Sequence, residues 1–143
     1  MATIGFRLIK GPSIINHLPE AASQSFKAGD LVMLTSGKVA IVSSDQTVYG
    51  VALEDASGTT GDDVPVLVIQ PDQIFLAQAD TTTAATHVGG KYGLNIGTAG
   101  SMSVDIGDTS TTTVRIEKLD PRDGAKANGR VYVKFDPDKL QNL

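Results

Sequence analysis

The chain has 143 residues, a formal net charge of −4 at pH 7 and no cysteine. Its length suits one domain with a single hydrophobic core. The lack of cysteine excludes disulfides, thiolate catalysis and cysteine-ligated zinc. The acidic balance argues against nucleic acid as the main partner, because phosphate binding needs a clustered basic surface. The sequence has no apolar run of about 18 residues and no signal-peptide core, so we expect neither a membrane partner nor export.

Residues 1–24 are apolar but are interrupted by Gly5, Gly11-Pro12 and Pro19. Proline lacks an amide donor and restricts the residue before it, so this pattern predicts an extended N-terminal arm. Two interpretations stay open: an arm that lies on a neighbouring chain, and an edge strand over residues 4–9 of the same domain. Deletion of residues 1–20 would leave the domain folded in the first case and unfold it in the second. The candidate partner-binding residues of the arm are its large apolar side chains: Ile4, Phe6, Leu8, Ile9, Ile14, Ile15 and Leu18.

Residues 25–54 are the best-defined part of the pattern and predict three strands. The apolar runs at 31–34 and 39–42 flank Ser36-Gly37-Lys38, which is typical of a short hairpin turn. A third strand is expected at 48–53. Short strands of this kind, rich in Val, Ile and Leu and separated by tight turns, favour a small all-β barrel.

The remaining strands follow at similar spacing. Residues 64–69 and 74–79 are expected to form a second hairpin around Pro71-Asp72, and residues 92–96 and 102–106 a third around a five-residue connection.

Alternating apolar and polar residues then predict two half-buried strands, at 114–119 and 130–135. From these segments we expect a barrel domain of about eight short strands over residues 25–135, followed by a C-terminal tail at 136–143 that is too short to form a stable helix alone.

Candidate chemical sites are weak in this sequence. His17 and His87 lie far apart and in no metal-ligand spacing, so we interpret them as surface or interface histidines. The acidic residues of the DPRDG segment, 120–124, lack the alternating ligands and closing Glu of a calcium loop and indicate a solvated turn. No nucleophile motif accompanies the serines. We therefore expect no enzyme activity, no cofactor and no metal.

One chemical alternative concerns Lys38. Biotinyl and lipoyl carrier domains are small β-structures with a modified lysine on an exposed hairpin, and Lys38 lies in the predicted Ser36-Gly37-Lys38 turn. Its Ser-Gly-Lys-Val surroundings differ from those of carrier lysines, so an ordinary turn lysine is the preferred interpretation.

The strings SFKAGDLV, GKVA, YGVALE and IQPDQIFLA, within residues 25–79, resemble the small capsid decoration, or cement, proteins of tailed bacteriophages. The resemblance implies a barrel of the β-tulip or SH3-like kind that trimerises on the outside of the phage head. It also implies arms that reach onto neighbouring subunits. No catalytic residue is implied, and residues 80–143 carry no part of the resemblance.

From these observations we expect a structural protein that binds the exterior of a capsid and bridges neighbouring capsomers. Its expected partners are the major capsid protein, further copies of itself in a homotrimer, and neighbouring decoration subunits through the arm. It would be made in the host cytoplasm and located on the outer capsid surface of the virion. The alternative is a β-barrel module that binds a ligand or glycan, although only three Tyr and no Trp are present to pack against sugars.

Overall fold

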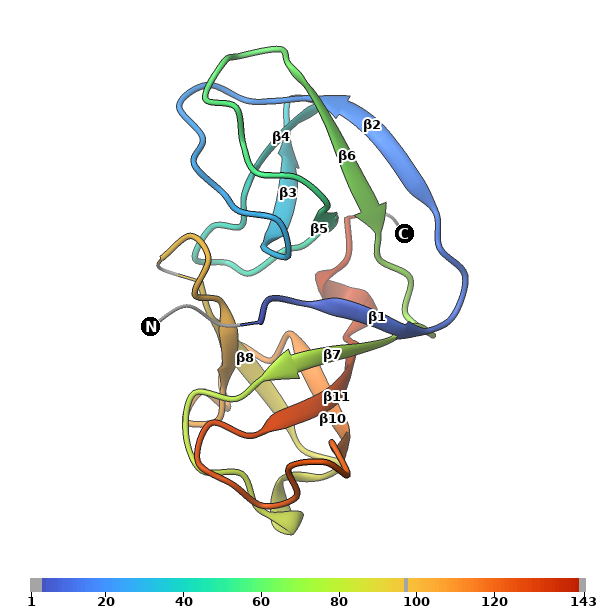
Figure 1. The fold of residues 1–143 in the computed structure, drawn as a ribbon, viewed down its shortest axis with the longest axis vertical. Coiled ribbons are helices and arrows are strands. Elements are labelled where there is room, and N and C mark those ends of the chain that lie inside the picture. The colour runs from blue at the N-terminus through green and yellow to red at the C-terminus, as the bar shows by residue number, and fades with distance from the viewer. Residues whose placement is uncertain (1–3, 97, 142–143) are drawn as a thin grey trace.

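The computed structural model describes residues 4–96 and 98–141, and it folds these into two antiparallel β-sheets (Figure 1). The six-stranded sheet, in the lower half of Figure 1, has the order β1-β7-β11-β10-β8-β9. Its strands are β1 (Arg7–Lys10), β7 (Ile74–Gln78), β8 (Lys91–Asn95), β9 (Ser103–Asp105), β10 (Val114–Leu119) and β11 (Arg130–Phe135). The five-stranded sheet has the order β2-β6-β5-β3-β4. Its strands are β2 (Ile15–Pro19), β3 (Leu31–Thr35), β4 (Lys38–Ile41), β5 (Gly50–Ala52) and β6 (Asp63–Val68).

The all-β prediction is confirmed, with two single-turn 3-10 helices as the helical content of the described residues: η1 (Ala85–His87) and η2 (Pro137–Lys139). No helix in this part of the chain has the length and apolar character needed to cross a membrane. The expected closed barrel is not formed by the described residues. In each sheet an isolated bridge joins strands that are not neighbours in the sheet order. Ala79, just after β7, pairs with Val104 of β9, and Glu20, just after β2, pairs with Val39 of β4.

Two predicted hairpins are confirmed. β3 and β4 pair through a two-residue turn in which Ser36 and Gly37 have φ angles of 51° and 77°. This left-handed backbone at both central positions matches the twist of the flanking strands, and glycine adopts it without steric cost. β8 and β9 form the other hairpin, in which Leu94 pairs with Val104. β5 adds to β3, as expected for the third strand of residues 25–54.

The hairpin predicted from residues 64–69 and 74–79 is wrong. β6 pairs with β2 and β5 in one sheet, whereas β7 pairs with β1 and β11 in the other. The turn at Pro71-Asp72 therefore passes the chain from one sheet to the next. Both strands are almost continuously buried, and a buried run does not itself specify which strand will be its neighbour.

Two hydrophobic clusters hold the sheets together. The larger cluster consists of side chains of the six-stranded sheet together with side chains of the five-stranded sheet that face it, and it fills the space between the two sheets. In it the ring of Phe135 lies 5.8 Å from that of Phe6 and 5.4 Å from that of Phe75, centroid to centroid. The smaller cluster lies on the other face of the five-stranded sheet, around Phe26 and Tyr49. The predicted inward faces of β10 and β11 are confirmed, because Val114, Ile116, Val131, Val133 and Phe135 are all buried.

The interpretation of residues 1–24 as a separate arm is wrong for the described part of that segment. β1 pairs with β7 and β2 pairs with β6, so the chain supplies an edge strand to each of its own sheets. The alternative of a self-paired edge strand is the correct one, and it applies to two strands rather than one.

The C-terminal tail is also part of the domain. Leu140 is buried in the larger cluster and forms a bridge with Val48, and the Gln141 side chain bonds to the Leu34 backbone. Residues 142–143 of the predicted tail lie outside the described residues, as do residues 1–3 of the predicted arm.

Candidate functional site

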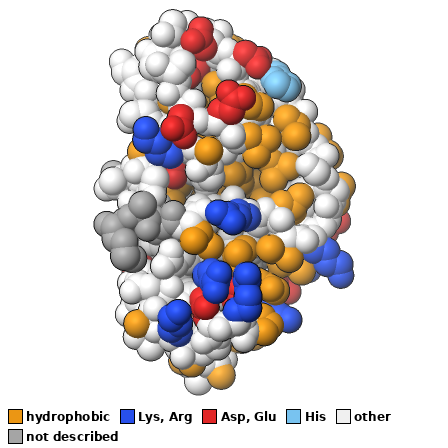
Figure 2. Space-filling model, viewed as in Figure 1, with side chains coloured by type: hydrophobic (Ala, Val, Ile, Leu, Met, Phe, Trp, Pro, Cys, Tyr) orange, Lys and Arg blue, Asp and Glu red, His pale blue; other side chains and the backbone are white. Residues whose placement is uncertain are grey.

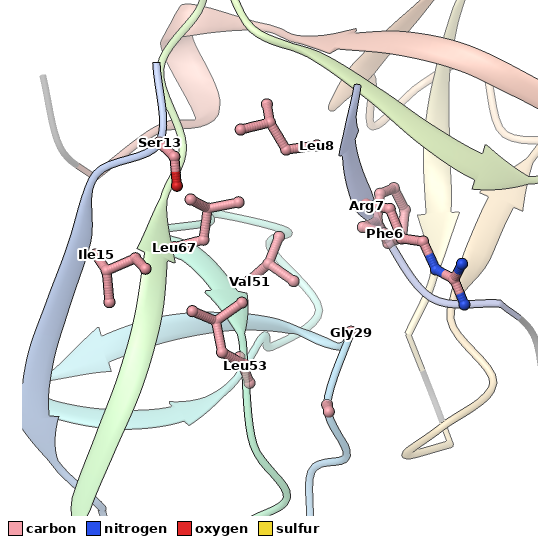
Figure 3. Close-up of a pocket in the computed structure, with 11 residues that line it drawn as sticks. Phe6, Arg7, Leu8, Ser13, Ile15, Gly29, Val51, Leu53 and Leu67 are labelled. Carbon is pink, nitrogen blue, oxygen red and sulfur yellow. The ribbon is translucent and has the colours of Figure 1, made fainter. Parts of the chain in front are cut away.

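An open apolar groove lies where the N-terminal segment passes from one sheet to the other, and we call it the intersheet groove. Its volume is about 560 Å³. β1 forms one wall, and β2, β5 and β6 form the other. Figure 3 shows side chains from both walls around the same space, and the lining residues are Phe6, Arg7, Leu8, Ser13, Ile15, Ala28, Gly29, Val51, Ala52, Leu53 and Leu67.

The groove is apolar at its mouth as well as at its floor. Leu67 and Val51 are buried at the floor, while Ile15 is 52% exposed and Leu53 is 39% exposed. Figure 2 shows hydrophobic side chains gathered across this face, with acidic side chains mainly above them and basic side chains mainly below. A contiguous apolar surface with a charged margin is characteristic of a protein interaction site.

Two close contacts position the β1 wall. Phe6 N donates a hydrogen bond of 2.9 Å to Gly29 O. A Cβ atom on Gly5 would lie 3.0 Å from the Gly29 Cα, so the two backbones can approach this closely only without side chains. The Gly29-Asp30 segment just before β3 therefore also anchors β1.

The crossing from β1 to β2 is held by Gln73. Its side chain is fully buried, donates 2.6 Å to Pro12 O and accepts 2.6 Å from Gln70 N. A Cβ atom on Gly11 would lie only 2.9 Å from Gln73 Cγ. Sequence analysis did not single out Gln73, because a glutamine after a Pro-Asp turn resembles an ordinary exposed loop residue.

Replacement of Gln73 by Ala is expected to destabilise the protein by about 1–3 kcal/mol, because it removes a fully buried side chain together with its hydrogen bonds to Pro12 O and Gln70 N. The measurement is the free energy of unfolding in urea. Gln70→Ala is the matched control, because the Gln70 side chain is only half-buried and only its backbone takes part in this contact. Equal stability of the two variants would contradict the anchoring role.

The seven candidate residues of the predicted arm have different positions. Phe6 is 2% exposed in the chain's own core, so its assignment as a partner-binding residue is wrong. Leu8 and Leu18 are half-buried and pack on the larger and smaller clusters respectively. Ile4 is half-buried beside a shallow pocket that includes Asn128. The three that are exposed in this chain are Ile9, Ile14 and Ile15, and their burial against another chain stays a prediction.

The histidines are far from forming a pair. His17 Nδ1 lies 2.6 Å from Asp63 Oδ2 on the exposed edge of the five-stranded sheet. His87 accepts a hydrogen bond from Ala84 N and packs edge-on against Tyr92. Over residues 4–96 and 98–141, no group of three or more His, Cys, Asp or Glu side chains is arranged to hold a metal ion.

The acidic loop at 120–124 is an ion-pair cluster. The buried carboxylate of Asp120 lies 2.7 Å from Arg122 Nη2, and Asp123 Oδ1 lies 2.7 Å from Arg130 Nη2. These arginines lower the pKa of both carboxyl groups below the usual 3.8. The sequence expectation of a freely solvated turn therefore needs correction, since the loop is tied to β11.

A pH prediction follows from this loop. Because the folded-state pKa of Asp123 lies below its usual value, its bond to Arg130 contributes stability above about pH 4, and this contribution is lost as the pH falls through the folded-state pKa. Asp123→Asn is expected to lower the unfolding midpoint near pH 6 and to reduce the further loss between about pH 4 and pH 2. Thermal unfolding across this range provides the measurement. Asp72→Asn, at an exposed position, is the control, and an identical acid response of the two variants would contradict the prediction.

Lys38 is exposed but does not occupy the tip of its hairpin. Ser36 and Gly37 form the turn, and Lys38 pairs with Thr35 as the first residue of β4. This placement weighs against the carrier-domain alternative.

Comparison with models of known protein families and with curated proteins gives no match to this chain.

Proposed function

We propose that this chain is a structural protein of a phage virion that binds the exterior of the capsid and stabilises the shell by bridging neighbouring capsomers. The sequence resemblance over residues 25–79 motivates the proposal. The observation that carries it is the intersheet groove, an open apolar surface on a scaffold held by two sheets and a shared core. Such a surface is suited to binding another protein.

The proposed assembly includes the major capsid protein, a homotrimer of this chain and contacts between neighbouring decoration subunits. Three copies held together would meet three capsid sites at high effective concentration, so that modest individual contacts give a long residence time. The β-tulip or SH3-like classification is part of the proposal. The isolated bridges Ala79–Val104 and Glu20–Val39, which join strands that are not neighbours in each sheet, are compatible with it. The proposed location is the outer capsid surface, and neither nucleic acid nor membrane is a proposed partner.

Co-sedimentation with phage heads that lack the decoration layer tests this function. The wild-type chain is expected to bind the heads saturably. Ile15→Asp is expected to weaken binding about tenfold or more, which needs only about 1.4 kcal/mol per site. Val88→Asp places the same charge at a position that is 42% exposed and outside the groove, and it should bind as the wild type does. A chain that stays in the supernatant at all concentrations would refute the proposal.

The second candidate is a ligand- or glycan-binding module, which is favoured by the groove volume, because it falls within the range of about 300–1,000 Å³ typical of ligand pockets. The tyrosines weigh against sugar binding. Tyr49 and Tyr92 are buried, and the Lys118 ammonium lies 5.3 Å from the ring centre of Tyr132. Specific, reproducible binding to a glycan array would support this candidate instead. A biotinyl or lipoyl adduct on Lys38, detected by mass spectrometry, would support the carrier alternative.

A further inference from the structure

The connection between β1 and β2 projects beside the intersheet groove and carries exposed apolar side chains. Ile9 is 46% exposed and Ile14 is 47% exposed, and neither side chain lines the groove. We call residues 9–14 the β1–β2 ridge. Ser13 of the ridge lines the groove, so the ridge borders the groove directly.

Unpaired charges of opposite sign lie on the ridge and beside the far wall of the groove. Lys10 is exposed on the ridge, and Glu54 is exposed directly after Leu53 of that wall. Within the described residues neither side chain makes an ion pair or a side-chain hydrogen bond. Figure 2 shows the same separation on a larger scale, since basic and acidic side chains gather on opposite sides of the apolar band.

We infer that the occupant of the intersheet groove is a second copy of this chain, bound across a two-fold axis so that the ridge of each copy lies in the groove of the other. The apolar side chains of the ridge match the apolar lining, and Lys10 of one copy would meet Glu54 of the other. Because the ridge and the groove are adjacent, the contact can be reciprocal. When the ridge of one copy enters the groove of the other, the second ridge and the first groove are also brought together. Opposite charges at the margin would fix the register of the two copies.

This inference rests on the proposed function, because the two-fold contact would be the contact between neighbouring decoration subunits that the function includes, and it can form in solution without heads. The homotrimer would use another surface, so the two-fold contact would link one trimer to the next. Failure of self-association with intact head binding would remove this inference alone. Self-association without head binding would remove the proposed function alone.

Charge reversal tests the inference on the full chain by sedimentation velocity. Lys10→Glu and Glu54→Lys are each expected to weaken self-association about tenfold or more, because each creates two like-charge pairs in a symmetric contact. A mixture of the two variants should associate as tightly as the wild type, since both charge pairs are then attractive across the axis. The double variant, which carries both reversals in one chain, should also self-associate as tightly as the wild type.

Matched controls separate this contact from a general effect of charge or of apolar surface. Lys38→Glu makes the same charge change at an exposed position away from the groove, and it should self-associate normally. Ile14→Asp should abolish the association, whereas Val88→Asp should not. A wild-type chain without concentration-dependent association overturns the inference. So does an association that the single reversals leave unchanged, or that the mixed variants do not restore.

Discussion

A chain that lacks residues 1–20 is expected to lose its cooperative thermal unfolding transition. The deletion removes β1 and β2, which pair with β7 and β6, and it removes Phe6 from the centre of the larger cluster. It also removes the buried carboxylate of Glu20, which accepts hydrogen bonds of 2.8 Å from Ser57 N and Gly58 N. Two strands, a core aromatic and a buried acceptor together exceed the roughly 5–15 kcal/mol that holds a typical domain folded.

Phe6→Ala isolates the largest single part of this effect. Loss of a buried phenylalanine costs about 3–5 kcal/mol, because the cavity it leaves is only partly refilled. For a chain of this size, the midpoint of thermal unfolding should fall by roughly 10–20 °C. Ile14→Ala, on the exposed ridge, is the control and should leave the midpoint nearly unchanged. If the chain lacking residues 1–20 kept its cooperative thermal unfolding transition and lost only its binding to phage heads, that result would instead support a separate N-terminal arm.

Gly50→Ala is expected to be among the most damaging single substitutions in the chain. Gly50 lies in β5, between β3 and β6, at the centre of the five-stranded sheet. A Cβ atom there would overlap the Leu67 carbonyl and would lie 2.5 Å from the Val66 side chain. The backbone of a central strand cannot move aside without breaking its ladder. The expected loss is therefore about 3 kcal/mol, the upper end for overpacked sites.

The measurement is the free energy of unfolding in urea. Gly107→Ala is the matched control, because its added Cβ would have Asp105 Oδ1 as its nearest neighbour, at an ordinary 3.4 Å, and its backbone is not in the left-handed region. That variant should stay within about 0.5 kcal/mol of the wild type or gain slightly from the reduced entropy of the unfolded chain. A Gly50→Ala chain as stable as the control would show that the two strands lie farther apart than described.

The local pattern of the sequence was sufficient to place the strands from residue 31 onward. Alternating residues in 114–119 and 130–135 correctly placed Val114, Ile116, Val131, Val133 and Phe135 on the buried face. Ser36-Gly37 specified the β3–β4 hairpin, because a two-residue turn with two left-handed positions has few sequence solutions. These features depend on neighbours within a few residues, and such information is present in the sequence itself.

The choice of partner strands was decided by the tertiary structure. Pro71-Asp72 marks a turn in either topology, and only the packing of β6 against β2 and β5, and of β7 against β1 and β11, sends the chain into a second sheet. The N-terminal segment shows the same dependence. Its apolar residues indicate burial. Whether they bury on their own domain depends on open edges at β6 and β7, whose residues lie 44–69 positions later in the chain than their partners.

The sequence by itself determined an all-β chain with short strands, tight turns and an apolar N-terminal segment, because periodicity and turn chemistry are local properties. Only the tertiary structure decided that Phe6 is core while Ile9, Ile14 and Ile15 are exposed. It also decided that the buried Gln73 anchors the crossing between the two sheets, and that the intersheet groove exists at all. A groove is the space between elements distant in the sequence, so its shape is set by how two sheets pack and not by any one stretch of residues.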